Sequence, residues 1–456
     1  MSDLLLGIDI GTSACKAGIV DFAGREVAIA REPTPWRVVP TGAELSTDDF
    51  EPAIQRAVAA VLRQVPVGRV IGIGITSMAE AGVLVDGHGR QVAPIMAWYD
   101  TRGDAEAAEL AMRLPDFSRT TGLPPTRLCS LAKYAWLVGN EQTAHAGRRW
   151  FSLAEWLAWR LSGEPVAEAS LASRTGWLDV ATGEVWRDAL DAVGAPGGLT
   201  PTLLPAGTVA GMVRPDRVAG DDLHRLAGAV VTVAGHDHIV SVVGAGMTDG
   251  RAVLDSCGTA EAFVLATGLP LDRDRVARAV ARGVTVGVHV LPDRRAWLGA
   301  LRSGAMLRRV LQLLGSSPES IRLAPVRSTT PDPVFFDGDD PAAVRVRDGA
   351  DPGASWRAAV DHVTTLGFSV LDAVHATAGS DPRSIVGCGG WLRDPTARAA
   401  KQRAFGPRFA VSPVREAGTR GAALLSGSAA GIYPSIRDMP PPTQDAEARG
   451  RVEGPA

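Results

Sequence analysis

"GIDIGTSACKAGIVD" at residues 7–21 and "VLDSCGTAEAFVLAT" at residues 253–267 follow the same order of residue types. Each stretch has an apolar run, small polar residues with a Gly-Thr pair, and a second apolar run. This order predicts a strand, a tight turn and a return strand. One stretch opens each half of the chain, which indicates either a duplicated α/β domain with a cleft between the copies or two unrelated hairpins, since Gly-Thr pairs are common.

The turn at Gly11, Thr12 and Ser13 offers successive backbone N–H groups and two hydroxyls, which suit the oxygens of a phosphate. Asp9 stands just before the turn, where its carboxylate could hold Mg²⁺, and Lys16 could reach a phosphate as a point charge. An ordinary hairpin turn with a capping Asp is the alternative. The chain has no GxxxxGK[ST] phosphate loop and no dinucleotide fingerprint, which excludes those two classes of nucleotide site.

A second polar feature interrupts an apolar stretch, "AGHDHIVSVVGAG" at residues 234–246. An Asp placed among residues typical of a core is costly unless it is paired, binds a metal or takes part in chemistry. His236 and His238 lack a nearby third ligand for zinc, and the chain has no GxSxG elbow of a serine hydrolase. Asp237 is therefore either a general base facing a substrate hydroxyl or a cap at the start of a helix.

The composition fits a globular protein of two or three domains, with 456 residues, 46% of them hydrophobic and 21% charged. A net charge of -3 gives no basic field for nucleic acid. The four cysteines are scattered, which argues against a zinc site or a disulfide framework. We find no signal peptide and no run of about 20 apolar residues, so we expect a soluble, cytoplasmic protein. A helix is predicted at about residues 47–64, with Ser46 or Thr47 as its N-cap.

Six stretches, in chain order, together resemble the FGGY family of carbohydrate kinases, which have the actin-like ATPase fold. They are "GIDIGTSACKAGIVD" (7–21), "WYDTR" (98–102), "EASLASRTGWLDVATGEVW" (168–186), "AGHDHIVSVVGAG" (234–246), "DSCGTAEAF" (255–263) and "GCGGW" (387–391) with "PVREAGTRGAALLSGSAAG" (413–431). The chain departs from the family pattern in several places. Glu168 replaces the usual Asp, and the segment after Trp391 lacks the usual adenosine-side sequence. At 456 residues the chain is somewhat short for the family, and its loop of Met78, Ala79 and Glu80 differs from that of xylulose kinases.

The resemblance implies an α/β fold of two ribonuclease-H-like domains with an interdomain catalytic cleft. The N-terminal domain, 1–244, would bind the sugar and carry the base, and the C-terminal domain, 245–433, would bind the nucleotide. The Pro-rich tail, 434–456, is expected to be disordered or loosely docked.

The implied activity is ATP-dependent phosphorylation of a hydroxyl on a small sugar, either a ketose such as fuculose or xylulose, or a polyol. Asp237 is the implied catalytic base, with Asp9 and Asp237 near Mg²⁺. The implied ATP-binding residues are Gly11, Thr12, Ser13, Lys16, Gly258, Thr259, Gly304, Gly389 and Gly390. The expected sugar-binding residues are Met78, Ala79, Glu80, Trp98, Asp100, Arg102, His236 and Asp237. Asp100 and Arg102 contact the sugar or brace their loop, and Trp98 stacks on the sugar or packs in the core.

A catalytically silent sugar- or nucleotide-binding regulator on the same fold is the alternative function. The presence of Asp9, Thr12, Asp237 and Thr259 argues against it. A general actin-like ATPase would leave the "WYDTR" stretch without a purpose. We expect no nucleic-acid or membrane partner, and the sequence leaves a homodimer open.

Overall fold

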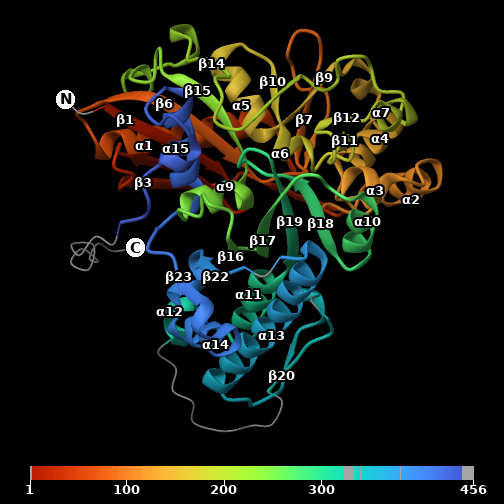
Figure 1. The fold of residues 1–456 in the computed structure, drawn as a ribbon, viewed down its shortest axis with the longest axis vertical. Helices are drawn as coiled ribbons and strands as arrows, with labels where there is room; N and C mark the ends of the chain where they lie inside the picture. Colours follow the sequence, from red (N-terminus) through yellow and green to blue (C-terminus); the bar gives the residue numbers. More distant parts are fainter. Residues whose placement is uncertain (1–2, 323–332, 339, 381, 444–456) are drawn as a thin grey trace.

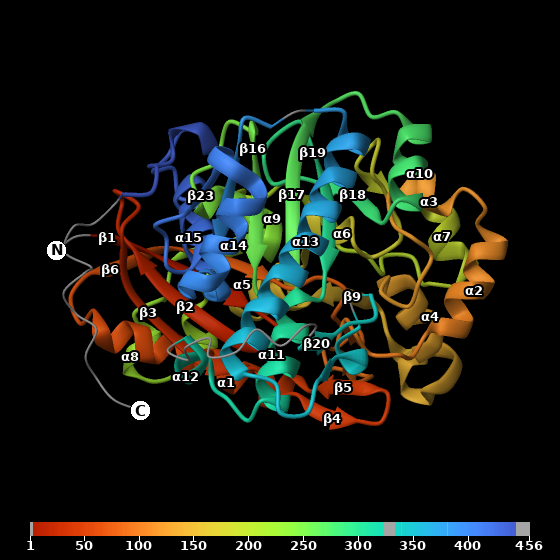
Figure 2. The same cartoon turned by 90° about the horizontal axis from the view of Figure 1, so that it is seen from below.

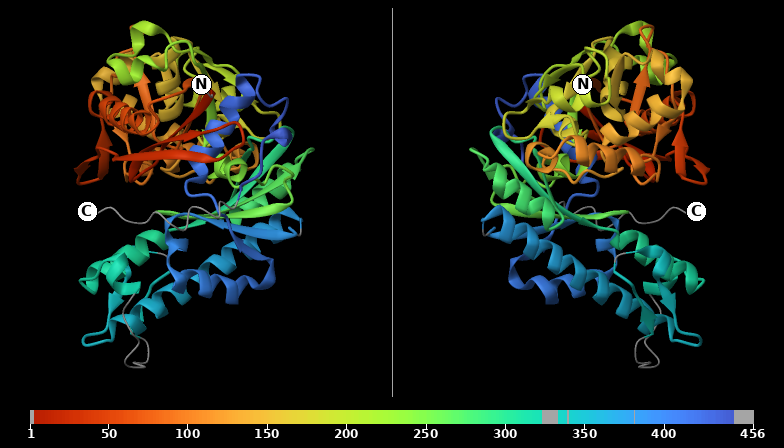
Figure 3. Two further views of the ribbon diagram at one scale, coloured as in Figure 1. Left: turned by 90° about the vertical axis from the view of Figure 1, so that its left-hand side faces the viewer. Right: turned by 90° about the vertical axis from the view of Figure 1, so that its right-hand side faces the viewer.

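A computed structural model describes residues 3–322, 333–338, 340–380 and 382–443. Within these residues, two six-stranded mixed sheets form the framework of the fold. The N-terminal elements occupy the upper part of the molecule in Figure 1, and most elements of the second half lie below them. The side views in Figure 3 show the same division. This arrangement confirms the predicted two-sheet α/β fold.

The first sheet contains the N-terminal hairpin and two parallel strands beside it. Its strand order is β14 (Gly211–Met212), β15 (Val230–His236), β6 (Arg69–Ser77), β1 (Asp3–Ile10), β2 (Ala14–Val20) and β3 (Glu26–Pro33). Nearly all of β1 and β6 is buried, as expected for parallel neighbours covered on both faces. The carboxyl ends of β1, β6 and β15 therefore meet at one edge of the sheet.

The second sheet begins with the repeated hairpin, now formed by β16 and β17. Its order is β18 (Val284–Val288), β19 (Arg294–Leu301), β17 (Glu261–Gly268), β16 (Ala252–Cys257), β22 (Ser384–Cys388) and β23 (Phe409–Val411). In each sheet the hairpin's first strand also pairs in parallel with a later strand, β1 with β6 and β16 with β22. Both predicted hairpins are thus present in equivalent positions.

Two helices fill the layer between the sheets, α9 (Asp237–Gly244) and α15 (Ala417–Ala429). Figure 1 shows α15, in blue, beside the red strands of the first half. An added Cβ at Gly7 would lie 1.8 Å from the Thr419 carbonyl oxygen, and one at Gly74 would lie 1.8 Å from that of Ala422. The small residues in these strands therefore allow the helix to approach the sheet backbone closely.

Other helices cover the outer faces of the two sheets. The first sheet is covered by α1 (Thr47–Gln64) and α5 (Leu153–Ser162). The second sheet is covered by α10 (Arg273–Ala281), α13 (Pro352–Ala378) and α14 (Pro395–Phe405). Figure 2 shows α13 crossing the second sheet. The α1 bounds match the predicted helix. Ser46 is its N-cap, and the hydroxyl of Ser46 accepts a hydrogen bond from the Asp49 N–H at 3.2 Å.

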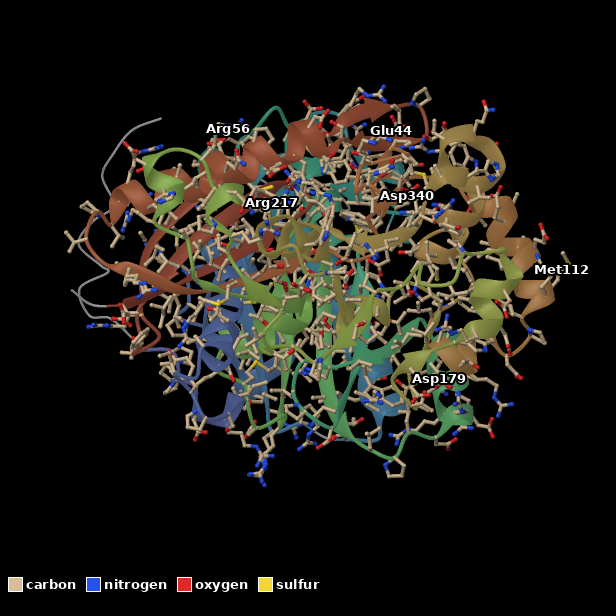
Figure 4. The ribbon with its side chains drawn as sticks, turned by 90° about the horizontal axis from the view of Figure 1, so that it is seen from above. Glu44, Arg56, Met112, Asp179, Arg217 and Asp340 are labelled. Carbon is tan, nitrogen blue, oxygen red and sulfur yellow. The ribbon has the colours of Figure 1, made fainter. Side chains whose placement is uncertain are left out.

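The remaining elements surround this framework. The helices are α2 (Asp104–Arg113), α3 (Phe117–Thr121), α4 (Ser130–Asn140), α6 (Ala169–Ala172), α7 (Arg187–Ala192), α8 (Asp221–His224), α11 (Ser303–Leu313) and α12 (Pro318–Arg322). The strands are β4 (Arg37–Val39), β5 (Gly42–Leu45), β7 (Gly82–Val85), β8 (Ile95–Met96), β9 (Arg149–Ser152), β10 (Val166–Glu168), β11 (Leu178–Asp179), β12 (Glu184–Val185), β13 (Thr202–Leu204), β20 (Val334–Phe335) and β21 (Arg345–Val346). Asp179, labelled in Figure 4, joins the two halves by an ion pair with Arg273 of α10, at 2.5 Å.

Residues 434–443 of the Pro-rich tail are docked on the fold, which corresponds to the second of the two expected arrangements. Ile436 and Met439 are buried in the layer between the sheets, and Arg420 Nη2 donates to the Pro440 carbonyl at 2.8 Å. The apolar side chains and this buried guanidinium give the segment a docking surface that its proline content does not reveal. Residues 444–456 lie outside the described residues. None of the helices described here is long and apolar enough to cross a membrane.

Candidate active site

A cavity of about 410 Å³ opens between the two sheets, at the edge where β1, β6 and β15 end. Both Gly-Thr turns line it, one from each sheet. Asp237 and the loop of Met78, Ala79 and Glu80 line it as well. The structure therefore brings the separate predicted motifs into one site.

Asp237 is the first residue of α9, while His236 is the N-cap and makes no side-chain cap hydrogen bond. The Asp237 carboxylate is 23% exposed, and its Oδ1 accepts a hydrogen bond from the His238 N–H at 2.7 Å. Burial raises the pKa of Asp237 to about 6, against the favourable charge of His238, and the nearby Asp9 also raises it. A carboxyl with such a pKa is ionised at neutral pH and is still basic enough to accept a proton.

The two histidines flank Asp237 but face different groups. His236 Nε2 lies 3.3 Å from Asp237 Oδ1, and burial holds the pKa of His236 well below its usual value, so its imidazole is neutral. His238 Nδ1 lies 3.1 Å from Ser256 Oγ on β16 of the second sheet. The histidines therefore orient the carboxylate and connect it with the other half of the molecule, and among the described residues neither belongs to a cluster of three metal-ligating side chains.

A buried polar chain shapes the corner that presents Asp237. Ser170 Oγ accepts a hydrogen bond from the His236 N–H at 3.0 Å and donates to Glu168 Oε2 at 2.6 Å. The backbone N–H groups of Ser170 and Leu171 also donate to Glu168. Burial raises the pKa of Glu168 to about 7. Glu168 thus caps α6 and fixes Ser170, which holds the backbone beside Asp237.

The two hairpin turns contact each other across the cavity. Ser13 Oγ lies 3.1 Å from Thr259 Oγ1. The Thr12 hydroxyl accepts a hydrogen bond from Trp98 Nε1 at 3.0 Å, which connects the first turn with the sugar-side loop. The hydroxyls of both turns thus line one cavity, where they could donate to the same phosphate group.

The acidic residue before the first turn fits a hard cation. Asp9 Oδ2 accepts a hydrogen bond from Lys16 Nζ at 3.2 Å, whereas Asp9 Oδ1 is buried and has no hydrogen-bond partner. Lys16 Nζ also lies 3.0 Å from Glu416 Oε2, and the charge of Asp9, followed by that of Glu416, raises the pKa of Lys16. Lys16 is therefore permanently charged at the cavity wall. A free carboxylate oxygen is the ligand type that Mg²⁺ prefers.

Met78, Ala79, Glu80 and Trp98 all line the cavity, as predicted. The Glu80 carboxylate accepts a hydrogen bond from Arg174 Nε at 2.7 Å. This pair presents acceptor and donor groups side by side, an arrangement suited to the hydroxyls of a polyol or sugar.

Asp100 and Arg102 are not among the residues that line the cavity; of the two roles expected for them, sugar contact and bracing of their loop, their contacts fit the second. Two guanidinium nitrogens of Arg102 donate to Asp100, each at 2.8 Å, and a third donates to Glu44 at 2.6 Å. Glu44 is labelled in Figure 4 beside the N-terminal elements. The buried Asp100 carboxylate needs this bidentate partner, so the pair braces the loop that carries Trp98.

The nucleotide-side glycines divide between the cavity and its support. Gly389 and Gly390 line the cavity, whereas Gly304 lies behind the second turn, where a Cβ would meet the Gly258 carbonyl oxygen at 2.0 Å. Gly304 therefore supports the turn and does not face the cavity, which differs from its predicted role. Gly389 has a φ of 110°, and an added Cβ would lie 2.3 Å from the Cys257 carbonyl oxygen.

Lys401, in the segment that departs from the family pattern, is buried under the second hairpin. Its Nζ lies 2.6 Å from both Asp255 Oδ2 and Glu261 Oε1. With Cys257 these carboxylates form a cluster of metal-ligand type, but the lysine ammonium already supplies the cation. This cluster is a buried ion triad that stabilises the base of the hairpin.

Sequence reasoning missed several cavity residues. Arg174 lies inside the quoted stretch 168–186, and Glu416 inside 413–431, yet neither has a spacing signal that marks it as functional. Lys133, which is buried and does not line the cavity, had one indirect signal, because the chain contains only three lysines, Lys16, Lys133 and Lys401.

Comparison with known proteins gives consistent matches along the chain. The profile described as "FGGY family of carbohydrate kinases, N-terminal domain" matches residues 4–244. A xylulose kinase of Streptomyces rubiginosus is 28% identical over 451 residues, covering 93% of this chain and 88% of that protein. A glycerol kinase of Rhizorhabdus wittichii is 25% identical over 476 residues, covering 96% and 91%. The crystal structure of a xyloylose kinase from Brucella ovis shares the fold, with a TM-score of 0.82 and 24% identity, over 96% of this chain and 93% of that one.

Proposed function

The chain belongs to the FGGY family of carbohydrate kinases, and we propose that it transfers the terminal phosphoryl group of ATP to a hydroxyl of a small sugar or polyol. The acceptor we propose is a ketose such as xylulose or fuculose, or a polyol such as glycerol. The observation that carries the proposal is the position of Asp237, which faces a cavity lined by both Gly-Thr turns and by the loop of Glu80.

In this reaction Asp237 accepts the proton of the substrate hydroxyl as its oxygen bonds to the terminal phosphorus of ATP. The bond between that phosphorus and the bridging oxygen breaks, and ADP leaves. Phosphoryl transfer has a loose transition state, so Asp237 serves mainly to aim the hydroxyl. The raised pKa of Asp237, about 6, supports this role, because the residue is ionised and basic at neutral pH.

The two turns and Lys16 would bind the phosphate oxygens of ATP. Asp9, whose Oδ1 has no hydrogen-bond partner, is the residue we assign to Mg²⁺, with Asp237 facing it across the cavity. Bound there, Mg²⁺ would neutralise negative charge on the transferred phosphoryl group. Lys16 adds a permanent positive charge beside it.

Glu80, Arg174 and Trp98 form the proposed acceptor side. Glu80 accepts hydrogen bonds from substrate hydroxyls, and the Arg174 guanidinium donates to them. Because Glu80 already compensates the charge of Arg174, an uncharged polyhydroxy substrate fits this wall better than an anionic one.

The test is release of ADP, coupled to NADH oxidation, with Mg-ATP and a panel that includes D-xylulose, L-fuculose and glycerol. We expect at least one acceptor to raise ADP release roughly tenfold or more above the rate with ATP alone. If ATP binds but no acceptor in a broad panel of ketoses, aldoses and polyols raises its turnover, the proposal fails and a silent regulator becomes the better explanation.

A further inference from the structure

Lys133 is a buried lysine without a carboxylate partner. It lies on α4 and is 1% exposed. Its ammonium donates three hydrogen bonds, all to backbone carbonyls: Ala97 at 2.7 Å, Trp98 at 3.1 Å and Glu80 at 3.2 Å. The other two lysines of the chain, in contrast, contact carboxylates.

These carbonyls belong to the two loops that form the acceptor wall of the cavity. The Glu80 and Trp98 side chains line that wall, and Trp98 Nε1 also donates to the Thr12 hydroxyl in the first phosphate turn. One ammonium group therefore joins the loop of Glu80, the loop of Trp98 and, through the indole, the phosphate side.

The backbone at Glu80 needs such an anchor. Its φ is 60°, a left-handed conformation that a residue with a Cβ adopts only when its surroundings impose it. Lys133 holds the carbonyl of Glu80, and Arg174 holds its carboxylate at 2.7 Å. Both ends of this strained residue are thus fixed from outside the loop, which keeps its carboxylate at the cavity.

Packing alone does not account for a lysine here. An apolar side chain at this position would avoid the cost of burying a charge. That cost is visible in the pKa of Lys133, which burial lowers to about 8. The charges of Glu80, Asp100 and Cys129 act to raise this pKa, and the like charge of Arg102 lowers it further.

We propose that Lys133 is a positioning residue for the acceptor substrate: its ammonium fixes the loops of Glu80 and Trp98 in the arrangement that binds the substrate hydroxyls. The kinetic part of this proposal rests on the proposed sugar or polyol kinase activity, whereas the structural part does not.

Lys133→Met removes the three donors and keeps a side chain of similar length. Arg225→Met is the matched control, because Arg225 also donates to three backbone carbonyls, those of Leu62, Val65 and Gly68, in the region of the C-terminal end of α1 and away from the cavity lining. We expect Lys133→Met to raise the KM for the acceptor, D-xylulose or glycerol, roughly 10- to 100-fold. The KM for Mg-ATP in this variant, and the acceptor KM in Arg225→Met, should change by no more than about twofold.

Hydrogen exchange of the same variants gives a readout that needs no substrate. In Lys133→Met, amides in residues 78–81 and 97–101 should exchange at least about tenfold faster than in the wild type, while the rest of the protein keeps its protection. Unchanged exchange in both loops would overturn the proposal, as would an unchanged acceptor KM. If the wild-type protein phosphorylates no acceptor, the proposed function fails, and hydrogen exchange alone decides the positioning role.

The wild-type enzyme provides a test that does not depend on the variant folding. Because the pKa of Lys133 is about 8 in the folded protein and 10.5 in a free side chain, loss of this proton favours the folded state between these pH values. The fold thus gains stability as the pH rises above 8, and a lysine that serves only this stability would leave the acceptor KM unchanged there. A positioning lysine loses one of its three N–H donors, so the acceptor KM should rise above about pH 8 while the Mg-ATP KM does not. A flat acceptor KM across this range would overturn the proposal.

Discussion

Replacing Asp237 with Asn should stabilise the protein while it abolishes phosphoryl transfer. The Asn side chain is isosteric, and its carbonyl oxygen can still accept the hydrogen bond that the His238 N–H donates to Oδ1 at 2.7 Å. The substitution therefore removes the negative charge and the proton-accepting group with little change of shape. If Asp237 is a buried base, the Asn variant should be more stable than the wild type. If Asp237 is a helix cap, the Asn variant should be less stable.

The magnitude follows from the raised pKa. A change from 3.8 to about 6 means that the ionised form is disfavoured in the folded state by up to about 3 kcal/mol. The folded protein binds this proton more tightly than the unfolded chain does, so the stability of the wild type decreases as the pH rises from about 4 to about 6. At pH 8 the Asn variant should be more stable by about 1–3 kcal/mol, and the difference should vanish below about pH 4. A helix-cap role would instead make the variant less stable, by about 1 kcal/mol.

The assay pairs urea unfolding at pH 8 and pH 4 with coupled ADP release. The kcat should fall roughly 10²- to 10⁴-fold, and binding of Mg-ADP should persist. In the wild type, kcat/KM should decline below about pH 6 as Asp237 takes up its proton. An Asn variant that is less stable than the wild type at pH 8, or that keeps its kcat within about tenfold, would refute the assignment of Asp237 as a buried base.

Four further variants, one of them a control, test the surroundings of the site. Glu80→Gly relieves the left-handed backbone strain but leaves the largely buried Arg174 guanidinium without its carboxylate, so it should lower the free energy of unfolding by about 1–3 kcal/mol and raise the acceptor KM. Asp293→Gly, at the other non-glycine residue with positive φ in the described chain, should instead stabilise the fold by about 1 kcal/mol and leave the kinetics unchanged. Ser170→Ala should lower the free energy of unfolding by about 1–3 kcal/mol and reduce kcat, because the buried N–H of His236 loses its acceptor; equal kcat in both proteins would contradict this role. Lys401→Met leaves two buried carboxylates without their cation and should cost about 3–5 kcal/mol in urea unfolding, with the acceptor KM unaffected.

The sequence predicted features that depend on neighbouring residues in the chain. The two hairpins follow from apolar runs around Gly-Thr turns, and α1 follows from its apolar period and its N-cap, Ser46. The ordered motifs also gave the family and placed Asp237, Glu80 and Gly258 at the same cleft. These features are encoded in local backbone preferences and in periodic burial, which a single sequence displays directly.

Only the tertiary structure decided which side chains form hydrogen bonds or ion pairs between residues far apart in the sequence. Arg102 braces its loop because its guanidinium donates a hydrogen bond to Glu44, which is 58 residues away in the sequence. Glu80 is paired with Arg174, 94 residues away, and Lys133 reaches the Glu80 carbonyl across 53 residues. The tail docks because the buried Arg420 donates to Pro440. A buried polar group is satisfied by whichever group the packing of the sheets brings within hydrogen-bond distance, and residue type and spacing do not specify that distance. The sequence therefore determined the framework and the chemistry of the cleft, whereas the fold determined which residues hold that chemistry in place.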